Sequence, residues 1–269
     1  MAKLGLDSFS YHRNMTGTRD VCWFLEKVVD LGLDGCQVDP IHLRNWDPDL
    51  VREIGKFCAL HGLYLELGSG GFDYDHLRGR IELAAEAGAR AMRTFIGGDR
   101  WSTPQERRVE IIGYATENFR RLAGTAERVG VPLALENHED LTSLEIAGII
   151  DAVQSPFIRT LVDTGNGLCV GEDPVECVRR LAPYAAATHL KDWKVWWEDG
   201  VPQRQGCALG QGDARVREAY AILRSARPDM PITIEIAAVR PGDAPMSVEE
   251  EDRMVVESVG FARADCSGP

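Results

Sequence analysis

The stretch IRTLVDTGNGLCVGEDP, residues 158–174, contains one complete strand-to-helix connection. Its apolar and β-branched residues predict a buried strand over 158–164. The strand ends at Asp163, and the following glycine-rich residues 164–167 predict a sharp turn. Asp173-Pro174 then predicts a helix start, because aspartate caps the first free amides and proline suits the first turn. An aspartate at the end of such a strand either caps a helix or holds a ligand, and the rest of the chain must decide between these roles.

The same pattern of apolar run, turn and amphipathic helix recurs along the whole chain. It predicts eight strands, at residues 4–9, 35–39, 63–68, 91–96, 132–137, 158–164, 186–192 and 232–237. Helix starts are predicted at Asp20, Asp47-Pro48, Thr103-Pro104, Asp173-Pro174, Asp213 and Ser247. Eight strand–helix units in about 260 residues predict a single (β/α)8 TIM barrel over residues 1–269. An open doubly wound sheet is the alternative, but no glycine-rich dinucleotide-binding turn follows the first strand.

Composition excludes several classes of partner. The net charge of the 269-residue chain is −12, and no run of lysine or arginine offers the positive potential that nucleic acid binding needs. No apolar run approaches the roughly 20 residues of a membrane span, and the N-terminus has no signal-peptide pattern. The seven cysteines are dispersed without a CxxC pair, as is typical of reduced thiols. We therefore expect a cytoplasmic protein with no nucleic acid or membrane partner.

Polar residues at the strand ends suggest a metal site. In a TIM barrel, the C-terminal strand ends surround the active site. Strands five to eight place there the residues Glu136, Asp163, His189 and Glu235. Three buried carboxylates would repel one another and be costly to desolvate, and a divalent cation removes both problems. Two Glu, one Asp and one His form an oxygen-rich set that suits Mn²⁺, with Mg²⁺ or Co²⁺ as alternatives.

The motifs around these four residues resemble those of a known family. LALENH (133–138), LVDTGN (161–166), THLKDW (188–193) and TIEIA (233–237) resemble the xylose isomerase-like barrel superfamily, in its sugar phosphate isomerase/epimerase branch. That branch includes ketose 3-epimerases, hydroxypyruvate isomerases and inosose dehydratases, and the resemblance covers nearly the whole chain. It implies that the four residues bind one Mn²⁺-like ion, that Glu136 and Glu235 flank a sugar substrate as acid and base, and that the chain forms a homo-oligomer.

Two departures from the epimerase pattern leave the reaction open. Asn166 stands where ketose 3-epimerases usually carry a histidine, and Thr142 stands where they carry a second glutamate. A metal-stabilised enediolate can be reprotonated on the other face, reprotonated on the next carbon, or lose a β-substituent. An isomerase or epimerase acting on a sugar or keto sugar is the first expectation. The alternatives are a lyase acting on a 3-keto sugar, inosose or keto-glycoside, and a non-catalytic sugar-binding subunit.

Further residues near the strand ends are candidates for the site. His138 follows the first ligand and suits proton transfer, because the ordinary pKa of histidine lies near neutrality. Lys191, two residues after His189, should lie on the same side of its strand and stabilise an enediolate. Candidate substrate contacts are His12, Asn166, Arg204, Trp101 and Trp193. The two tryptophans are candidates because five of the six tryptophans follow strand ends, where aromatic rings can stack on a sugar. The loop GCALGQGD (206–213) could bind a phosphate, but Asp213 as a helix cap would compete for its amides.

Overall fold

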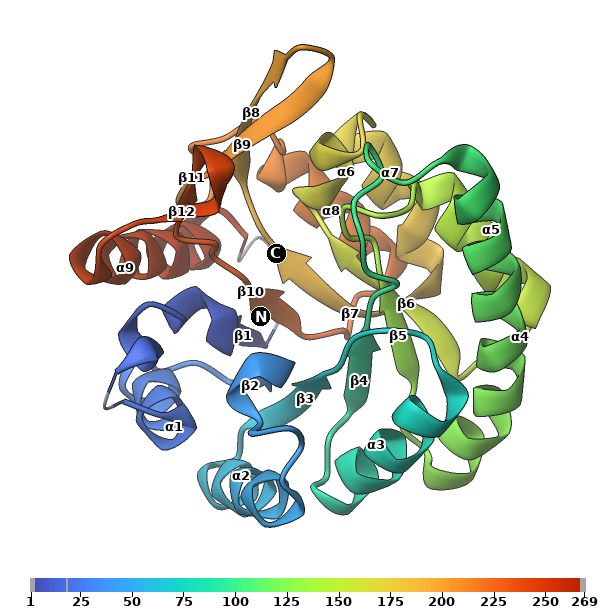
Figure 1. Cartoon of the computed structure of the whole chain (residues 1–269). Helices are drawn as coiled ribbons and strands as arrows, with labels where there is room; N and C mark the ends of the chain where they lie inside the picture. The colour runs from blue at the N-terminus through green and yellow to red at the C-terminus, as the bar shows by residue number, and fades with distance from the viewer. Residues whose placement is uncertain (1–2, 18, 267–269) are drawn as a thin grey trace.

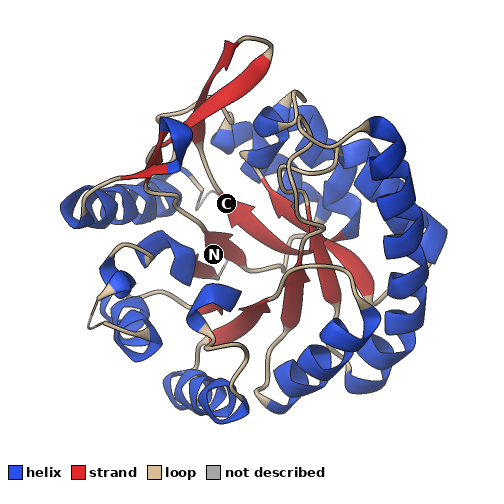
Figure 2. Ribbon diagram, viewed as in Figure 1, coloured by secondary structure: helices blue, strands red, loops and turns tan. Residues whose placement is uncertain are grey.

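Eight parallel strands close into a barrel. The computed structural model describes residues 3–17 and 19–266. The barrel strands are β1 (Leu4–Asp7), β2 (Gly35–Val38), β3 (Tyr64–Gly68), β4 (Ala91–Thr94), β5 (Leu133–Glu136), β6 (Ile158–Asp163), β7 (Ala185–Leu190) and β10 (Ile232–Ile234). Each pairs with the next in sequence, and β10 pairs with β1 to close the ring (Figures 1 and 2). The prediction of a (β/α)8 TIM barrel is confirmed.

Helices surround the barrel and mostly begin where the sequence signals place them. They are α1 (Val21–Asp30), α2 (Pro48–His61), α3 (Tyr74–Glu86), α4 (Gln105–Val129), α5 (Ser143–Val153), α6 (Asn166–Cys169), α7 (Pro174–Leu181), α8 (Val216–Ala226) and α9 (Val248–Asp265). Asp173 caps α7, and Ser247 forms a capping box with Glu250 at α9. The predicted helix start at Asp213 is wrong: α8 begins at Val216, and Asp213 instead accepts a hydrogen bond from the backbone of Val195.

The long connection after β7 carries structure that the sequence pattern did not predict. It forms an antiparallel hairpin of β8 (Trp193–Glu198) and β9 (Val201–Gly206), which projects from the barrel in Figure 1. A second small hairpin, β11 (Val239–Arg240) with β12 (Ala244–Pro245), lies in the last connection. Short 3-10 helices occur at η1 (Ser8–Tyr11), η2 (Asn14–Thr16), η3 (Pro40–His42), η4 (Ala182–Tyr184) and η5 (Pro241–Asp243).

Strand alternation separates the barrel interior from the surrounding core. The main hydrophobic core fills the space between the strands and the helices. A second cluster of Ala91, Ala134, Leu161, Ala186 and Ala187 is small and distinct. Four of these residues lie two positions before Arg93, Glu136, Asp163 and His189, so they share a strand face with those polar residues. The small side chains therefore fill the barrel interior below the polar layer.

Two observations bear on the compositional expectations. In the part of the chain that the structure describes, no helix has both the length and the apolar character that crossing a membrane requires. All seven cysteines are free thiols in this structure. Cys36 and Cys58 face each other in the core with their sulfur atoms 3.8 Å apart.

Candidate metal centre and active-site cavity

The four predicted ligands converge at the C-terminal end of the barrel. Glu136 ends β5, Asp163 ends β6, His189 lies on β7, and Glu235 directly follows β10. One ligand atom from each residue can be chosen so that all four atoms lie within 4.8 Å of one another. None of the four residues is more than 3% exposed. The barrel thus brings together one imidazole and three carboxylates from four neighbouring strands.

The imidazole of His189 points one nitrogen at the carboxylates and the other into the barrel. Its Nδ1 lies 2.9 Å from Glu235 Oε2, 3.3 Å from Glu136 Oε1 and 3.7 Å from Asp163 Oδ2. Its Nε2 lies 2.9 Å from Gln37 Oε1. The ring therefore offers Nδ1 to any ion held by the three carboxylates, while Nε2 is held by a neighbouring amide.

The residues of this cluster have perturbed pKa values. Burial lowers the pKa of His189, but Glu235 and the other carboxylates outweigh burial and raise it well above its ordinary value. Burial raises the pKa of Glu136, yet the charge of Arg93 and the hydrogen bond from His189 bring it down to about 2. Burial also raises the pKa of Asp163, and there it outweighs the neighbouring Lys191. Without a cation, protonated His189 balances part of the negative charge.

The donor set fits a divalent cation. Asp163 Oδ2 is fully buried and accepts no hydrogen bond within the described residues. Its other oxygen accepts the amides of Gly165 and Asn166, at 2.8 and 2.9 Å, so the carboxylate is held in a fixed orientation. A buried carboxylate oxygen without a partner is costly, and a cation among the four side chains would satisfy it. Carboxylate oxygens with one imidazole are ligands that Mn²⁺, Mg²⁺, Co²⁺ and Zn²⁺ all accept.

Two buried cations contact the outer carboxylates of the cluster. Arg93 Nε donates to Glu136 Oε2 at 2.6 Å, and its Nη1 lies 3.3 Å from Asp39 Oδ2. Lys191 Nζ lies 3.1 Å from Glu235 Oε2, and its neighbours raise the pKa of Lys191 despite burial. Burial raises the pKa of Glu235, but Lys191 and His189 outweigh it and lower that pKa well below its ordinary value.

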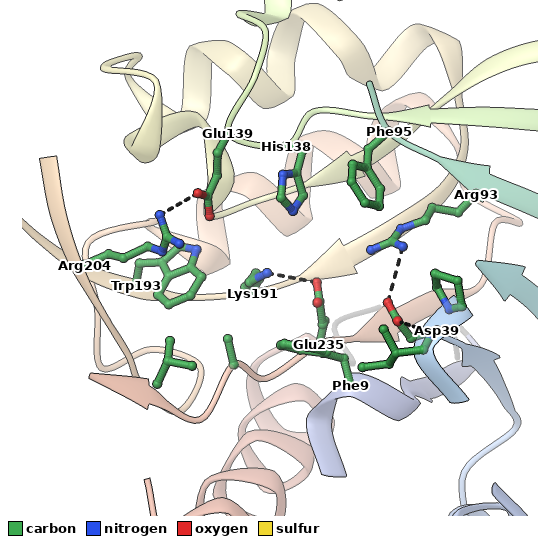
Figure 3. A pocket seen from close by; sticks show the side chains of 14 residues that line it. Phe9, Asp39, Arg93, Phe95, His138, Glu139, Lys191, Trp193, Arg204 and Glu235 are labelled. Atoms are coloured by element: carbon green, nitrogen blue, oxygen red, sulfur yellow. Dashed lines mark hydrogen bonds and ion pairs between the residues drawn. The ribbon is translucent and has the colours of Figure 1, made fainter. Parts of the chain in front are cut away.

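A cavity of about 380 Å³ opens beside the cluster, and Glu235 belongs to both. Figure 3 shows His138, Lys191 and Glu235 around this cavity, with Arg93 and Asp39 on one side. The ring of His138 stacks on Phe95, with centroids 4.7 Å apart. The His138 Nδ1 atom is buried and has no hydrogen-bond partner within the described residues. The structure thus brings the predicted catalytic residues His138 and Lys191 to the same cavity as Glu235.

The predicted substrate contacts Arg204 and Trp193 line this cavity as well. Arg204 Nη1 donates to Glu139 Oε2 at 2.5 Å, and the guanidinium lies 5.4 Å from the centre of the Trp193 ring. Trp193 Nε1 donates to Asn166 Oδ1 at 3.2 Å. Asn166 is fully buried, and its amide nitrogen lies 3.2 Å from the Asn137 carbonyl oxygen and 3.5 Å from Glu136 Oε1. Asn166 is not among the residues that line the cavity, so it supports Glu136 and Trp193, and its predicted contact with a substrate has no support from the geometry.

The structure places His12 and Trp101 outside the lining of this cavity. His12 lines a neighbouring cavity, where its ring stacks on Phe9, which lines both. Trp101 is 40% exposed, donates to the Cys169 carbonyl and packs edge-on against Trp197. Direct contact of either residue with a substrate in the cavity beside Glu235 therefore stays a prediction without support from the geometry.

The loop 206–213 already holds a carboxylate of the protein. Asp192 accepts hydrogen bonds from the amides of Gly210, Gly212 and Ala214, at distances of 2.9–3.0 Å. The loop amides that could have bound a phosphate are therefore occupied, although by Asp192 and not by the predicted Asp213. This arrangement favours a substrate without a phosphate at this position.

Residues without a predicted role complete the site. Arg93 lines the cavity and binds Glu136, although the sequence shows it only as a charged residue inside the apolar strand AMRTFI. That is the same signal that marked the four ligands, and it could have identified Arg93. The aromatic walls formed by Phe9 and Phe95, and the amide of Gln37, give no such signal, because apolar and neutral residues are ordinary in strands and loops.

The fold and site define a TIM-barrel protein with a buried carboxylate–histidine cluster beside a polar cavity. The chain belongs to the xylose isomerase-like TIM barrel family, whose model matches residues 25–264. The resemblance inferred from the sequence motifs is therefore confirmed.

Individual relatives of this chain are mainly enzymes acting on sugars and related compounds. A 3-oxo-isoapionate decarboxylase of Pectobacterium atrosepticum is 26% identical over 191 residues, which span 70% of this chain and 67% of the decarboxylase. A D-psicose 3-epimerase from Clostridium cellulolyticum H10, solved with D-tagatose, matches 98% of this chain and 99% of its own, with a TM-score of 0.76 and 16% identity. The IolI protein, solved with a zinc atom, matches 96% of this chain and 98% of its own, with a TM-score of 0.70 and 16% identity. The two structures establish likeness of fold.

Proposed function

We propose that this protein is a divalent-metal-dependent isomerase or epimerase that acts on a sugar or keto sugar through an enediolate. The observation that carries the proposal is the convergence of Glu136, Asp163, His189 and Glu235 beside a cavity lined by His138 and Lys191. The sugar epimerase among the structural neighbours supports the substrate class. We expect Mn²⁺ as the ion, with Mg²⁺ or Co²⁺ as alternatives; zinc, present in IolI, would also fit the ligands.

The metal ligands and the cavity residues have separate tasks in this proposal. A divalent cation held by the four ligands would polarise a substrate carbonyl and stabilise the negative charge of the enediolate. Lys191 is buried and positively charged, and its position beside Glu235 lets it donate a hydrogen bond to a substrate oxygen that gains charge. Arg93 holds Glu136 in place through Oε2 and leaves Oε1 facing His189.

We assign the proton transfer to His138. Glu136 and Glu235 both have lowered pKa values, so each is a weak base, although the sequence resemblance implied that they act as acid and base. His138 lines the cavity, and stacking on Phe95 holds its imidazole ring there. One imidazole on one face can move a proton between neighbouring carbons, which is isomerisation. Epimerisation also needs a donor on the other face, and Lys191 and Glu235, which line the same cavity, are the candidates for it.

A lyase is the second candidate, and one observation favours it. The cavity offers Lys191 to stabilise an enolate and His138 to move protons. Elimination from a keto compound needs one base that takes the α-proton and can return it to the leaving group, whereas decarboxylation needs one proton donor. Neither elimination nor decarboxylation needs a second base, and the lowered pKa values of Glu136 and Glu235 make each of these residues a weak base. The similarity to a 3-oxo acid decarboxylase points the same way. The substrate would be a 3-keto sugar, inosose, keto-glycoside or keto acid.

One experiment separates these functions. Mn²⁺-loaded protein is incubated in D₂O with a panel of keto sugars and 3-keto sugar acids, and the products are analysed by NMR. Deuterium uptake with the carbon skeleton intact supports an isomerase or epimerase, whereas an enone or carbon dioxide supports a lyase. Glu235→Gln and His138→Gln should each slow exchange at least about 10²-fold, and Glu82→Gln, on the outer surface, serves as the matched control. No reaction with any member of the panel, or exchange that survives both substitutions, would reject the assignment and favour a sugar-binding protein.

The cavity supports binding of a small molecule. A homo-oligomeric state and a cytoplasmic location stay predictions from the sequence.

A further inference from the structure

A chain of hydrogen bonds runs from His189 through the interior of the barrel. His189 Nε2 lies 2.9 Å from Gln37 Oε1, and Gln37 Nε2 donates to Glu66 Oε2 at 3.0 Å. Glu66 Oε1 then pairs with Arg90. Gln37 and Glu66 are direct register neighbours on β2 and β3, and both are fully buried. Arg90 precedes β4, and its side chain is 31% exposed, so the chain ends at the opposite face of the barrel from the cavity.

The donor and acceptor groups along this chain allow only one direction for each hydrogen bond. Arg90 can only donate, and Glu66, paired with it, can only accept. Thr233 also donates to Glu66 Oε2, at 3.2 Å. The amide nitrogen of Gln37 must therefore face Glu66, and its oxygen must face His189. Because that oxygen only accepts, His189 Nε2 must carry a hydrogen atom.

We infer that Gln37 and Glu66 are positioning residues that fix the tautomer of His189. With the hydrogen on Nε2, the neutral imidazole carries its lone pair on Nδ1, the atom that faces Glu136, Asp163 and Glu235. Arg90 anchors the chain because a guanidinium can only donate to Glu66. The inference rests on the proposed function in one respect, that the cluster binds a divalent cation.

Replacing Glu66 by glutamine removes the group that dictates the amide orientation. The new amide can donate to Gln37, so the amide of Gln37 can rotate and present its nitrogen to His189. The ring then carries its hydrogen on Nδ1, where it blocks the metal. Loss of a partner that orients a metal-binding histidine typically weakens metal affinity about 10- to 100-fold, and we expect a loss in this range for Glu66→Gln.

Exchanging the two side chains should restore the direction of the chain. In the double variant Gln37→Glu/Glu66→Gln, a carboxylate at position 37 accepts from His189 Nε2 and from the amide at position 66. The composition and charge of the pair are unchanged, so the double variant should bind Mn²⁺ more tightly than Glu66→Gln alone, despite carrying one more substitution. A general loss of packing would give the opposite order.

The test is the dissociation constant of Mn²⁺, measured by calorimetry on the full chain, with folding checked by circular dichroism. Glu251→Gln is the matched control, because Glu251 is also fully buried and accepts amides, those of Arg13 and Asn14, in another part of the molecule. A 10- to 100-fold loss for Glu66→Gln, recovery in the double variant and no change in the control would support the inference.

Other outcomes overturn the inference. If Glu66→Gln binds Mn²⁺ as tightly as the wild type, or if the double variant does not recover affinity, the positioning role is rejected. The metal site itself would still be supported, because the wild type binds Mn²⁺. Absence of Mn²⁺ binding in the wild type would reject both the inference and the proposed function. If Glu66→Gln does not fold, Gln37→Met takes its place: it removes the acceptor for Nε2 and should bind Mn²⁺ more weakly than the double variant.

Discussion

Replacing Arg93 by methionine should destabilise the metal-free protein by several kcal/mol. Arg93 is 4% exposed and contacts Glu136 at 2.6 Å and Asp39 at 3.3 Å, so the substitution leaves two buried carboxylates without their cation. The methionine side chain keeps most of the apolar stem of Arg93, which limits the loss of packing. The effect should therefore come mainly from the lost charge.

The pKa of Glu136 sets the magnitude. Burial acts to raise this pKa, and Arg93 is the largest of the influences that lower it, so that it falls from 4.5 to about 2. A net change of that size corresponds to about 3 kcal/mol of folding free energy, to which Arg93, His189 and His138 contribute together against burial. Breaking a buried ion pair by removing one partner costs a similar amount, about 3–5 kcal/mol. We therefore expect the free energy of unfolding at pH 7 to fall by about 3 kcal/mol.

The pH dependence has a definite sign. The folded pKa of Glu136 lies below the unfolded value, so its stabilising contribution is present above about pH 4.5 and is lost as the pH falls towards 2. In Arg93→Met, burial of Glu136 is opposed less, and its pKa should rise. The difference in stability between wild type and variant should therefore be largest near neutral pH and narrow as the pH falls from 7 to 4.

The assay is urea unfolding in the presence of EDTA at pH 7 and pH 4. Arg128→Met is the matched control, because Arg128 contacts Glu82 at the same 2.6 Å distance but is 59% exposed. An exposed pair contributes only about 0–1 kcal/mol. If Arg93→Met costs no more than Arg128→Met, or if its effect does not depend on pH, burial of the Arg93–Glu136 pair does not have the energetic role argued here.

Three further predictions concern the ligand cluster, the cavity and the β8–β9 hairpin. Asp163→Asn should abolish Mn²⁺ binding and yet raise the Tm in EDTA at pH 7, because burial raises the pKa of Asp163 and makes its ionised form unfavourable. Elemental analysis checks the loss of metal and calorimetry checks the Tm, and a lower Tm would contradict the reasoning. His138→Gln should slow substrate deuterium exchange about 10²- to 10⁴-fold with unchanged Mn²⁺ affinity, whereas a parallel loss of metal would indicate a structural role. Gly206→Ala should lower the Tm, because a Cβ there would lie 1.6 Å from the Ala237 carbonyl oxygen, whereas Gly113→Ala, in open space within α4, should raise it slightly.

The sequence predicted the barrel and its ligand cluster because both depend on local patterns. Each barrel strand is a short apolar run followed by a turn, and this periodicity survives without knowledge of the tertiary structure. Asp163 and His189 were visible because a charged or polar side chain inside an apolar run must have a partner. Parallel strands then place such residues at one end of the barrel, which is where the structure has them.

The parts of the site that sequence reasoning missed depend on contacts between distant segments. Gln37 and Glu66 become partners through the register of β2 and β3, which no single strand encodes. Buried and exposed residues alternate only weakly in the β8–β9 hairpin, since most of its residues are partly or fully exposed. Its sequence pattern therefore does not distinguish it from a loop. Asp213 has the residue type of a helix cap, but the helix begins three residues later, at Val216. The amide of Val195, in the hairpin, is the group that Asp213 binds.

Arg93 and Lys191 contact the cluster in different ways, and the difference bears on catalysis. Arg93 binds Glu136 through Oε2, while Oε1 faces His189 Nδ1, so Arg93 can stay in place when Oε1 holds a cation. Lys191 binds Glu235 through Oε2, the same oxygen that lies 2.9 Å from His189 Nδ1, so a cation held by that oxygen would share it with Lys191. Occupation of the centre should therefore weaken the hold of Glu235 on Lys191. Because Lys191 lines the cavity and its ammonium group carries three N–H donors, it can donate to a substrate oxygen while it stays beside Glu235.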